Sequence, residues 1–264
     1  EIVAEALFVA SEQSIMRNLV RNYTIAGGGK SVEVPIYANV SAAAVSEASD
    51  LSNTAINPTS VTITASEVGI MTTLTDLARN SASRNVAGDI GRLFGEAIAR
   101  KIDADLSALF TGFSTEKGPG AGNEIVVQDL FEAAAELRTN NAPGPYYGVF
   151  HPKQIFNVKK TLTNTFVGRD TELSNEAMRS GFVGNIAGIQ IFESSNISVD
   201  GSDDSIGGVF SQDALALAMM QDLKIESQRD ASLRADELVA TAVFGVSEIH
   251  DSYGVKITAD TLAA

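Results

Sequence analysis

The sequence contains no cysteine and no tryptophan, and only two of its 264 residues are histidine. Without cysteine, disulfide bonds, thiolate nucleophiles and cysteine-ligated metal sites are excluded. Aromatic residues make up 6% of the chain, which argues against a carbohydrate-binding surface or a platform for base stacking. No uninterrupted apolar run approaches the ~20 residues that a membrane-spanning helix needs, so we expect no membrane partner.

Basic residues are also scarce. The chain has 19 lysines and arginines against 33 aspartates and glutamates, for a net charge of −14. Proteins that hold nucleic acid tightly neutralise phosphates with clustered basic residues, whereas the basic residues here are scattered. If this protein lies near DNA, we expect it to enclose the DNA without sequence-specific binding.

The stretch AGGGKS, residues 26–31, resembles a phosphate-binding loop at first sight. That loop has the pattern G-x-x-x-x-G-K-[ST] and is followed by a helix. Here Thr24 stands where the first glycine belongs, and the residues after Ser31 alternate between apolar and polar, as in a strand. The sequence therefore predicts a glycine turn into a β-ribbon and not a nucleotide-binding enzyme.

Two strand-like stretches follow, SVEVPIYANV and TSVTITASEV, within residues 31–68. The linker between them has almost no large apolar residue, so the two stretches predict a long hairpin with little surface to pack on its own body. A bare two-stranded ribbon is only marginally stable in water. We therefore expect the hairpin to rest on a partner.

Residues 84–113, RNVAGDIGRLFGEAIARKIDADLSALFTGF, carry apolar side chains at spacings of three and four. This spacing predicts an amphipathic helix of about six turns whose apolar stripe packs on the strand at residues 238–249. The core of the stripe is predicted to be Leu93, Phe94, Ile98 and Ile102. Asp103 and Asp105 are two positions apart, so they point to different sides of the helix and are expected to be solvated.

The rest of the chain alternates helices and strands and shows no catalytic signature. His151 precedes Pro152 at the expected start of a helix and is interpreted as a turn or capping residue. No short motif joins it to His250, and neither a G-x-S-x-G elbow nor an H-E-x-x-H motif is present. We expect no catalytic residue, no metal site and no cofactor.

The order of these parts resembles the major capsid protein of tailed bacteriophages, whose fold is shared with herpesvirus shells and encapsulins. Three stretches carry the resemblance, which covers nearly the whole chain. GGGKSVEVPIY is similar to the entry of the family's extended loop, and GFVGNIAGIQIFESSNI to its glycine-punctuated strand. GGVFSQDALALAMMQDLKIESQRD, residues 207–230, is similar to its F-x-x-D-A-L-A passage and the following strand.

The resemblance implies an α+β fold in four parts. These are an N-terminal arm at residues 1–28, an extended β-hairpin loop at 29–68, a peripheral domain with a long spine helix at 69–121 and 223–264, and an α/β axial domain at 122–222. A subunit that occupies both pentamers and hexamers needs soft hinges, and glycines provide them. The expected structural hinge, where the ribbon leaves the arm, is formed by Gly27, Gly28 and Gly29.

The resemblance further implies a structural, non-enzymatic protein of the virion, assembled in the host cytoplasm. It would form homo-pentamers and homo-hexamers of an icosahedral shell around double-stranded DNA. Its expected partners are further copies of itself, a scaffold and a portal, with a cement or decoration protein as a further candidate. Some relatives weld their shells by joining a loop lysine to a neighbour's asparagine. Residues 32–68 contain no lysine and Val209 stands in the asparagine's part of the passage, so we expect no such crosslink.

An encapsulin, the shell protein of a cellular nanocompartment with the same fold, is the alternative that the sequence leaves open. Neighbouring portal and terminase genes would favour a phage, and a gene for an enzyme cargo would favour the compartment. A β-rich adhesin is opposed by the long central helix.

Overall fold

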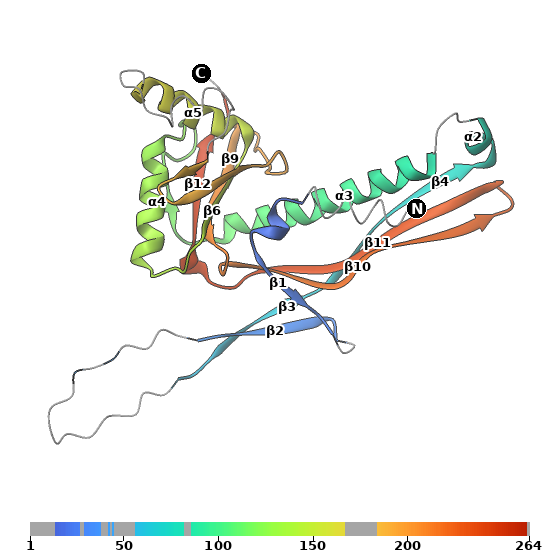
Figure 1. Cartoon of the computed structure of the whole chain (residues 1–264), viewed down its shortest axis with the longest axis horizontal. Coiled ribbons are helices and arrows are strands. Elements are labelled where there is room, and N and C mark those ends of the chain that lie inside the picture. The colour runs from blue at the N-terminus through green and yellow to red at the C-terminus, as the bar shows by residue number, and fades with distance from the viewer. Residues whose placement is uncertain are drawn as a thin grey trace.

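A long helix lies along a four-stranded sheet, and a second sheet joins the end of this helix (Figure 1). The computed structural model describes residues 14–26, 29–37, 42, 44, 56–81, 86–166 and 184–262. Its helices, with η marking 3₁₀ turns, are η1 (Met16–Asn18), α2 (Asp76–Ser81), α3 (Val86–Ala108), η2 (Leu109–Gly112), α4 (Val127–Thr139), α5 (Pro152–Phe166) and η3 (Asp251–Tyr253).

The strands form three sheets. In spatial order, the four-stranded sheet contains β1 (Arg21–Thr24), β10 (Leu215–Asp230), β11 (Ala235–Glu248) and β4 (Ser66–Thr75). The six-stranded sheet contains β5 (Glu116–Lys117), β12 (Gly254–Asp260), β9 (Asp204–Ser211), β6 (Tyr146–Phe150), β8 (Ile189–Glu193) and β7 (Asn185–Ile186). The third sheet is a hairpin of β2 (Ser31–Ile36) and β3 (Thr59–Thr64).

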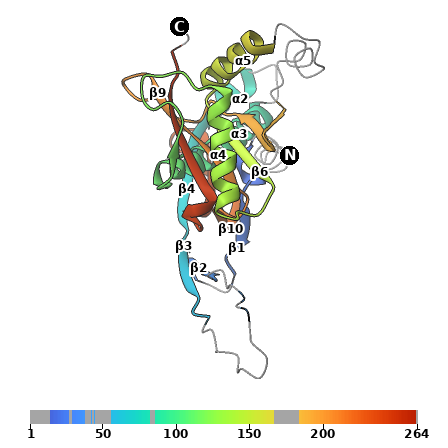
Figure 2. The same ribbon diagram turned by 90° about the vertical axis from the view of Figure 1, so that its left-hand side faces the viewer.

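The hairpin projects away from the rest of the molecule (Figures 1 and 2). Its strands are antiparallel, with Ser31 opposite Thr64 and Ile36 opposite Thr59. Because β2 begins directly after Lys30, a strand and not the helix of a phosphate-binding loop follows the glycines. Most of the predicted linker between the two strands lies outside the described residues.

One face of α3 packs against the four-stranded sheet. The exposed fractions are 3% for Phe94, 4% for Ile98 and 2% for Ile102. The strand β11 supplies the opposing side chains, and because its residues alternate between two faces, every second one meets the helix. Those side chains are Leu238, Ala240, Ala242 and Phe244.

The predicted place of Leu93 in this stripe is wrong, because 57% of this residue is exposed. Successive residues of an α-helix are about 100° apart around its axis. The buried face is fixed by Phe94, Ile98 and Ile102 at intervals of four. Leu93 therefore lies beyond the edge of that face, although its apolar character fits the sequence pattern.

Phenylalanines pack the end of α3 against the six-stranded sheet. Phe110 and Phe113 are fully buried, and the ring centroids of Phe110 and Phe210 lie 5.5 Å apart. Glycines on the facing strands make room for these rings. A Cβ at Gly254 would stand 2.1 Å from the Phe113 ring, and one at Gly208 would stand 2.6 Å from the Phe110 ring. A larger residue at either position would force the helix end away from the sheet.

The helices α4 and α5 pack against the six-stranded sheet, and Figure 2 shows α4 lying along it. Their apolar faces close a core separate from that of α3. The buried apolar residues of these two helices are Leu130, Ala133, Ala134, Leu137, Ile155 and Val158. The two cores meet at the end of α3, where Val149 and Phe210 of the six-stranded sheet belong to the cluster around the long helix.

The sheets do not follow the predicted domain boundaries. The strand β5 was predicted to lie in the peripheral domain but pairs with β12 of the six-stranded sheet, and the start of β10, up to residue 222, was predicted to be axial but lies in the four-stranded sheet. The strand β12 was predicted to lie in the peripheral domain with the rest of residues 223–264. Instead it pairs with β9 of the six-stranded sheet, from Gly254 opposite Phe210 to Asp260 opposite Asp204. The physical reason is the short turn η3 after β11, which carries the chain from one sheet to the other.

Two aliphatic residues of α3 test the assignment of its buried face. Ile98→Ala opens a cavity against β11 and should lower the free energy of unfolding by about 2–5 kcal/mol. Leu93→Ala removes a solvated side chain and should change it by about half a kcal/mol or less. Urea melts of the unassembled subunit measure both values. Equal losses, or a larger loss for Leu93→Ala, would show that the helix buries a different face.

Candidate functional site

The described part of the chain does not gather the side chains of a catalytic or metal centre. Its histidines, aspartates and glutamates form no group of three or more that could hold a metal ion. Within the same residues, no helix is long and apolar enough to cross a membrane. Burial lowers the pKa of His151, and its Nδ1 accepts a hydrogen bond from the Lys153 N–H at 3.4 Å. His151 thus caps the first turn of α5.

The predicted glycine hinge lies only partly in the described chain. Gly27 and Gly28 are outside the described residues. At Gly29 a Cβ would come no closer than 3.7 Å to another atom, the backbone oxygen of Ser31, which is an ordinary contact. The described backbone therefore does not require glycine at position 29, and the hinge role of the three glycines stays a prediction.

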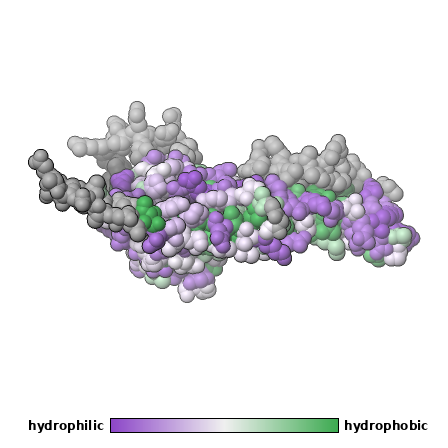
Figure 3. Space-filling view, turned by 90° about the horizontal axis from the view of Figure 1, so that it is seen from below, coloured by the Kyte–Doolittle hydropathy of each residue, from purple (hydrophilic) through white to green (hydrophobic). Residues whose placement is uncertain are grey.

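The described strands of the hairpin are fixed to the body by a small apolar cluster. Val34 and Ile63, which are 7% and 1% exposed, pack in this cluster with residues of β10. At the other end of the described strands, 62% of Tyr37 and 56% of Ile56 are exposed. In the space-filling view, apolar surface borders the grey segment at one end of the molecule (Figure 3). The hairpin thus holds large apolar side chains in solvent, away from the subunit's own core.

A buried carboxylate holds the N-terminal segment on the long helix. Asp103 is 1% exposed, and one of its oxygens accepts hydrogen bonds from the Ser14 hydroxyl at 2.7 Å and the Met16 N–H at 3.1 Å. The other oxygen accepts the Ile15 N–H at 3.1 Å. Burial raises the pKa of Asp103, while these donors act in the opposite direction.

The prediction that Asp103 is solvated is therefore wrong. Asp103 lies at the border of the buried stripe, and the segment before β1 covers that side of the helix. Asp105 has the expected partly exposed position and pairs with Lys101 at 2.7 Å. Because Asp103 provides both oxygens to three donors, it fixes residues 14–16 on α3.

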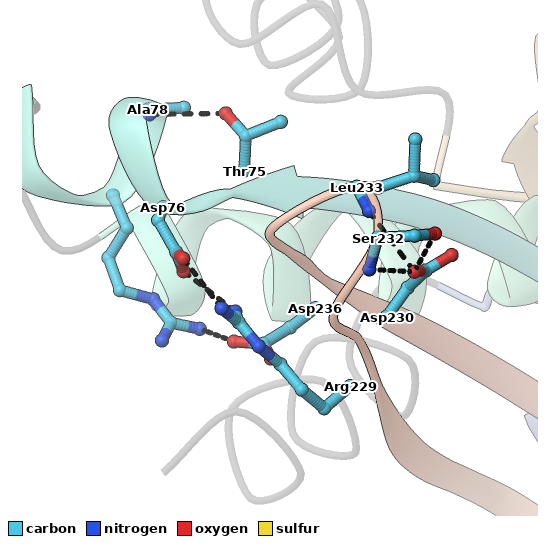
Figure 4. A network of polar contacts seen from close by, with 9 residues as sticks. Thr75, Asp76, Ala78, Arg229, Asp230, Ser232, Leu233 and Asp236 are labelled. Carbon is cyan, nitrogen blue, oxygen red and sulfur yellow. Dashed lines mark hydrogen bonds and ion pairs between the residues drawn. The ribbon is translucent and has the colours of Figure 1, made fainter.

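The far end of the four-stranded sheet is held by a network of ion pairs (Figure 4). The guanidinium of Arg229 donates to both oxygens of Asp76, at 2.7 and 2.6 Å, and lies 3.3 Å from Asp236. Arg79 also pairs with Asp236. The hydrogen bonds from Arg229 lower the pKa of Asp76. Two parallel hydrogen bonds fix orientation as well as charge, so this network ties α2 to the turn between β10 and β11.

That turn has its own support and exposes a leucine. One oxygen of Asp230 accepts hydrogen bonds from the Ser232 N–H at 2.8 Å, the Ser232 hydroxyl at 2.6 Å and the Leu233 N–H at 3.1 Å. The side chain of Leu233 points away from this turn, and Leu233 is 57% exposed (Figure 4). Leu77 on the neighbouring α2 is 80% exposed. The polar network thus holds two solvated leucines at the end of the sheet.

Comparisons with known proteins identify what these features belong to. Residues 58–257 match the family described as phage capsid protein. The chain belongs to this family. The match spans β3, the long helix and most of both larger sheets, so the resemblance stated from the sequence is confirmed. This phage capsid protein is therefore a structural component of the virion.

Solved capsids share the fold at low sequence identity. The capsid protein of cyanophage P-SCSP1u is 20% identical, with a TM-score of 0.72, over 93% of this chain and 88% of that chain. A Mycobacterium phage Che8 chain is 22% identical, with a TM-score of 0.68, over 87% and 84%. The capsid of a native GTA particle is 12% identical, with a TM-score of 0.74, over 94% and 90%. No curated protein matches the chain.

Sequence reasoning missed the polar contacts that shape this capsid protein. Arg229 and Asp76 are 153 positions apart, and Asp103 and Ser14 are 89 positions apart, so no local motif joins either pair. One signal for Asp103 was available. It stands one position after Ile102 of the predicted stripe, and the structure shows that Ala99, four positions before Asp103, extends the covered side of the helix to it.

Removal of the buried carboxylate should release the N-terminal segment. Asp103→Ala leaves three buried donors without their acceptor and should destabilise the subunit by about 1–3 kcal/mol or more. Asp105→Ala breaks only an exposed ion pair, which contributes about 0–1 kcal/mol. Urea melts and limited proteolysis near residues 14–20 compare the two variants. If the two variants have the same free energy of unfolding and the same rate of cleavage by protease, the carboxylate of Asp103 does not anchor the segment.

Proposed function

We propose that this capsid protein assembles into homo-pentamers and homo-hexamers of a closed icosahedral shell that encloses double-stranded DNA. Assembly takes place in the host cytoplasm with a scaffold and a portal, and a cement protein is a further candidate partner. The protein has no enzymatic turnover of its own.

The observation that carries this proposal is the hairpin of β2 and β3. It has one buried end and one end where Tyr37 and Ile56 are mostly exposed. A two-stranded ribbon of this kind is marginal alone and gains stability when its edges and side chains meet another surface. A neighbouring copy of the same chain provides that surface in a shell, so we expect the hairpin to lie over the adjacent subunit.

The end of the four-stranded sheet is a second contact surface in this proposal. Leu77 and Leu233 are exposed there, and the ion pairs of Arg229 hold the elements that carry them. Exposed apolar side chains on a rigid support are typical of surfaces that bury themselves against a partner. We expect this surface to contact other subunits where several copies meet.

The charge of the chain suits a container for DNA. A net charge of −14 disfavours tight binding to phosphates, so packaged DNA would be confined and not held by the shell. The match to the phage capsid protein family favours the phage shell over the encapsulin alternative. The two kinds of shell differ in what they enclose. The phage shell encloses DNA, and the encapsulin compartment encloses an enzyme cargo.

A deletion in the hairpin tests the proposal. The wild-type protein, expressed with its scaffold, should form round closed particles in negative-stain micrographs. Replacing residues 38–57 by a short glycine–serine turn should abolish stable particles and leave the helical circular dichroism unchanged, because the removed segment contains almost no large apolar residue. A variant with a glycine–serine segment of the original length separates the effect of chemistry from that of reach.

Two results would contradict the proposal. One is a wild-type protein that sediments only as a monomer under all assembly conditions, with scaffold included. The other is a deletion variant that loses its helical signal, because this loss would place the loop in the subunit's own core.

A further inference from the structure

All three chain crossings between the two large sheets meet at one place. The first runs from η2 to β5, the second from β9 to β10, and the third from β11 through η3 to β12. The backbone oxygen of Ala214, in the second crossing, accepts hydrogen bonds from Ile249 N at 2.8 Å and His250 N at 3.2 Å, both in the third. In the first crossing, Ser114 donates its N–H to Asp251 Oδ1 at 2.8 Å, and its hydroxyl also donates to Asp251. We call this place, residues 109–116, 211–215 and 248–254, the joint.

Two carboxyl groups face each other in the joint. The side chains of Glu248, at the end of β11, and Asp251, in η3, act on each other, and the charge of Asp251 opposes ionisation of Glu248. The carboxyl of Glu248 also lies against the backbone of η2, since a Cβ at Gly112 would stand 2.9 Å from its Oε2. Glu248 thus touches the first crossing directly, and Asp251 touches it through Ser114.

We propose that Glu248 and Asp251 form a proton-sensitive clamp that stiffens the joint between the two sheets. In the closed clamp, the protonated carboxyl of Glu248 donates its O–H to the carboxylate of Asp251. When Glu248 releases this proton to water, two carboxylates remain side by side and repel each other. The third crossing is then pushed away from η2, and the two sheets can change their relative angle more easily.

The two carboxyl groups differ in a way that suits these roles. Partial burial and the charge of Asp251 raise the pKa of Glu248 to about 7. Burial opposes ionisation of Asp251 as well, yet the two hydrogen bonds from Ser114 lower its pKa overall. Asp251 is therefore the fixed acceptor, and Glu248 is the group that gains or loses the proton near neutral pH.

The other charged groups around the clamp do not compensate an ionised Glu248. Lys256 of β12 favours the anion of Asp251, and it lies 3.8 Å from Glu116. In the β9–β10 crossing, Asp213 pairs with Arg21 and also acts on His250.

The uncharged neighbours complete these surroundings. His250 lies against Tyr253 with ring centroids 4.7 Å apart, and burial lowers its pKa. The residue of β10 opposite Glu248 is Leu215. None of the ion pairs in the described ranges includes Glu248, so its negative charge would stand unpaired beside Asp251.

The pH dependence follows from the raised pKa. In the unfolded chain Glu248 titrates near its ordinary value of 4.5, whereas in the folded subunit it titrates near 7. The stabilisation from its protonated form is therefore complete below about pH 4.5 and is lost as the pH rises through about 7. The lowered pKa of Asp251 acts in the opposite sense, since its contribution is lost only in acid.

The test compares Glu248→Gln with the wild-type subunit in urea melts between pH 5.5 and 8.5. Glutamine stays neutral at every pH, and its amide can donate to Asp251 in place of the protonated carboxyl. For the wild type, the folding equilibrium constant should fall by about tenfold or more between these limits from this group alone. Glu248→Gln should remove that fall and should be the more stable protein at pH 8.5. Glu237→Gln, on the same strand, is the matched control and should keep the wild-type dependence.

Hydrogen exchange locates the effect in the joint. In the wild type, amides of residues 109–116 and 248–254 should exchange faster at pH 8 than at pH 6 after correction for the intrinsic rate, and in Glu248→Gln they should not. If Glu248→Gln does not fold, Asp251→Asn supplies the second test, because removal of the neighbouring charge should move the wild-type transition to lower pH. A wild-type subunit with no transition near pH 7, or a Glu248→Gln subunit that keeps it, would overturn the proposal.

Discussion

The packing of one face of α3 against the four-stranded sheet is the interaction on which the other parts of the subunit depend. Phe94, Ile98 and Ile102 press on β11, whose small residues Ala240 and Ala242 let the helix come close. Leucine-sized side chains on both surfaces would hold the helix farther away. Because both surfaces are long, this single contact gives the subunit a rigid axis to which three other features are attached.

Each attached feature uses a different part of that axis. The hairpin starts from the sheet, since a single residue separates the end of β3 from the start of β4. The N-terminal segment is tied to the last third of the helix by Asp103, and the second sheet packs on the helix end through Phe110 and Phe113. The subunit therefore has a packed body and a hairpin whose outer apolar residues are exposed. A shell protein needs such exposed surface for contacts with its neighbours.

The periodic parts of this arrangement could be predicted from the sequence, and the long-range polar parts could not. The stripe of α3 and the strand alternation of the hairpin arise from local spacing, and the order of elements was enough to identify the capsid family. Local spacing does not define the edge of a buried face, which is why Leu93 was misplaced. Local spacing also does not show which distant segment covers a helix, and for this reason the sequence predicts a solvated Asp103. The crossing of β12 into the other sheet depends on pairing with β9, more than forty positions away.

Hydrogen exchange of the isolated subunit and of the assembled particle tests the central claim, that the body is complete in one chain and the hairpin is completed by a neighbour. Amides of α3 and β11 should be equally protected in both states, because their packing lies within one subunit. Amides at the exposed end of the hairpin, residues 36–37 and 56–60, should exchange rapidly in the subunit and gain about tenfold or more protection in the particle. Equal protection of this end of the hairpin in both states would contradict the account, because it would then be stable without a neighbouring copy.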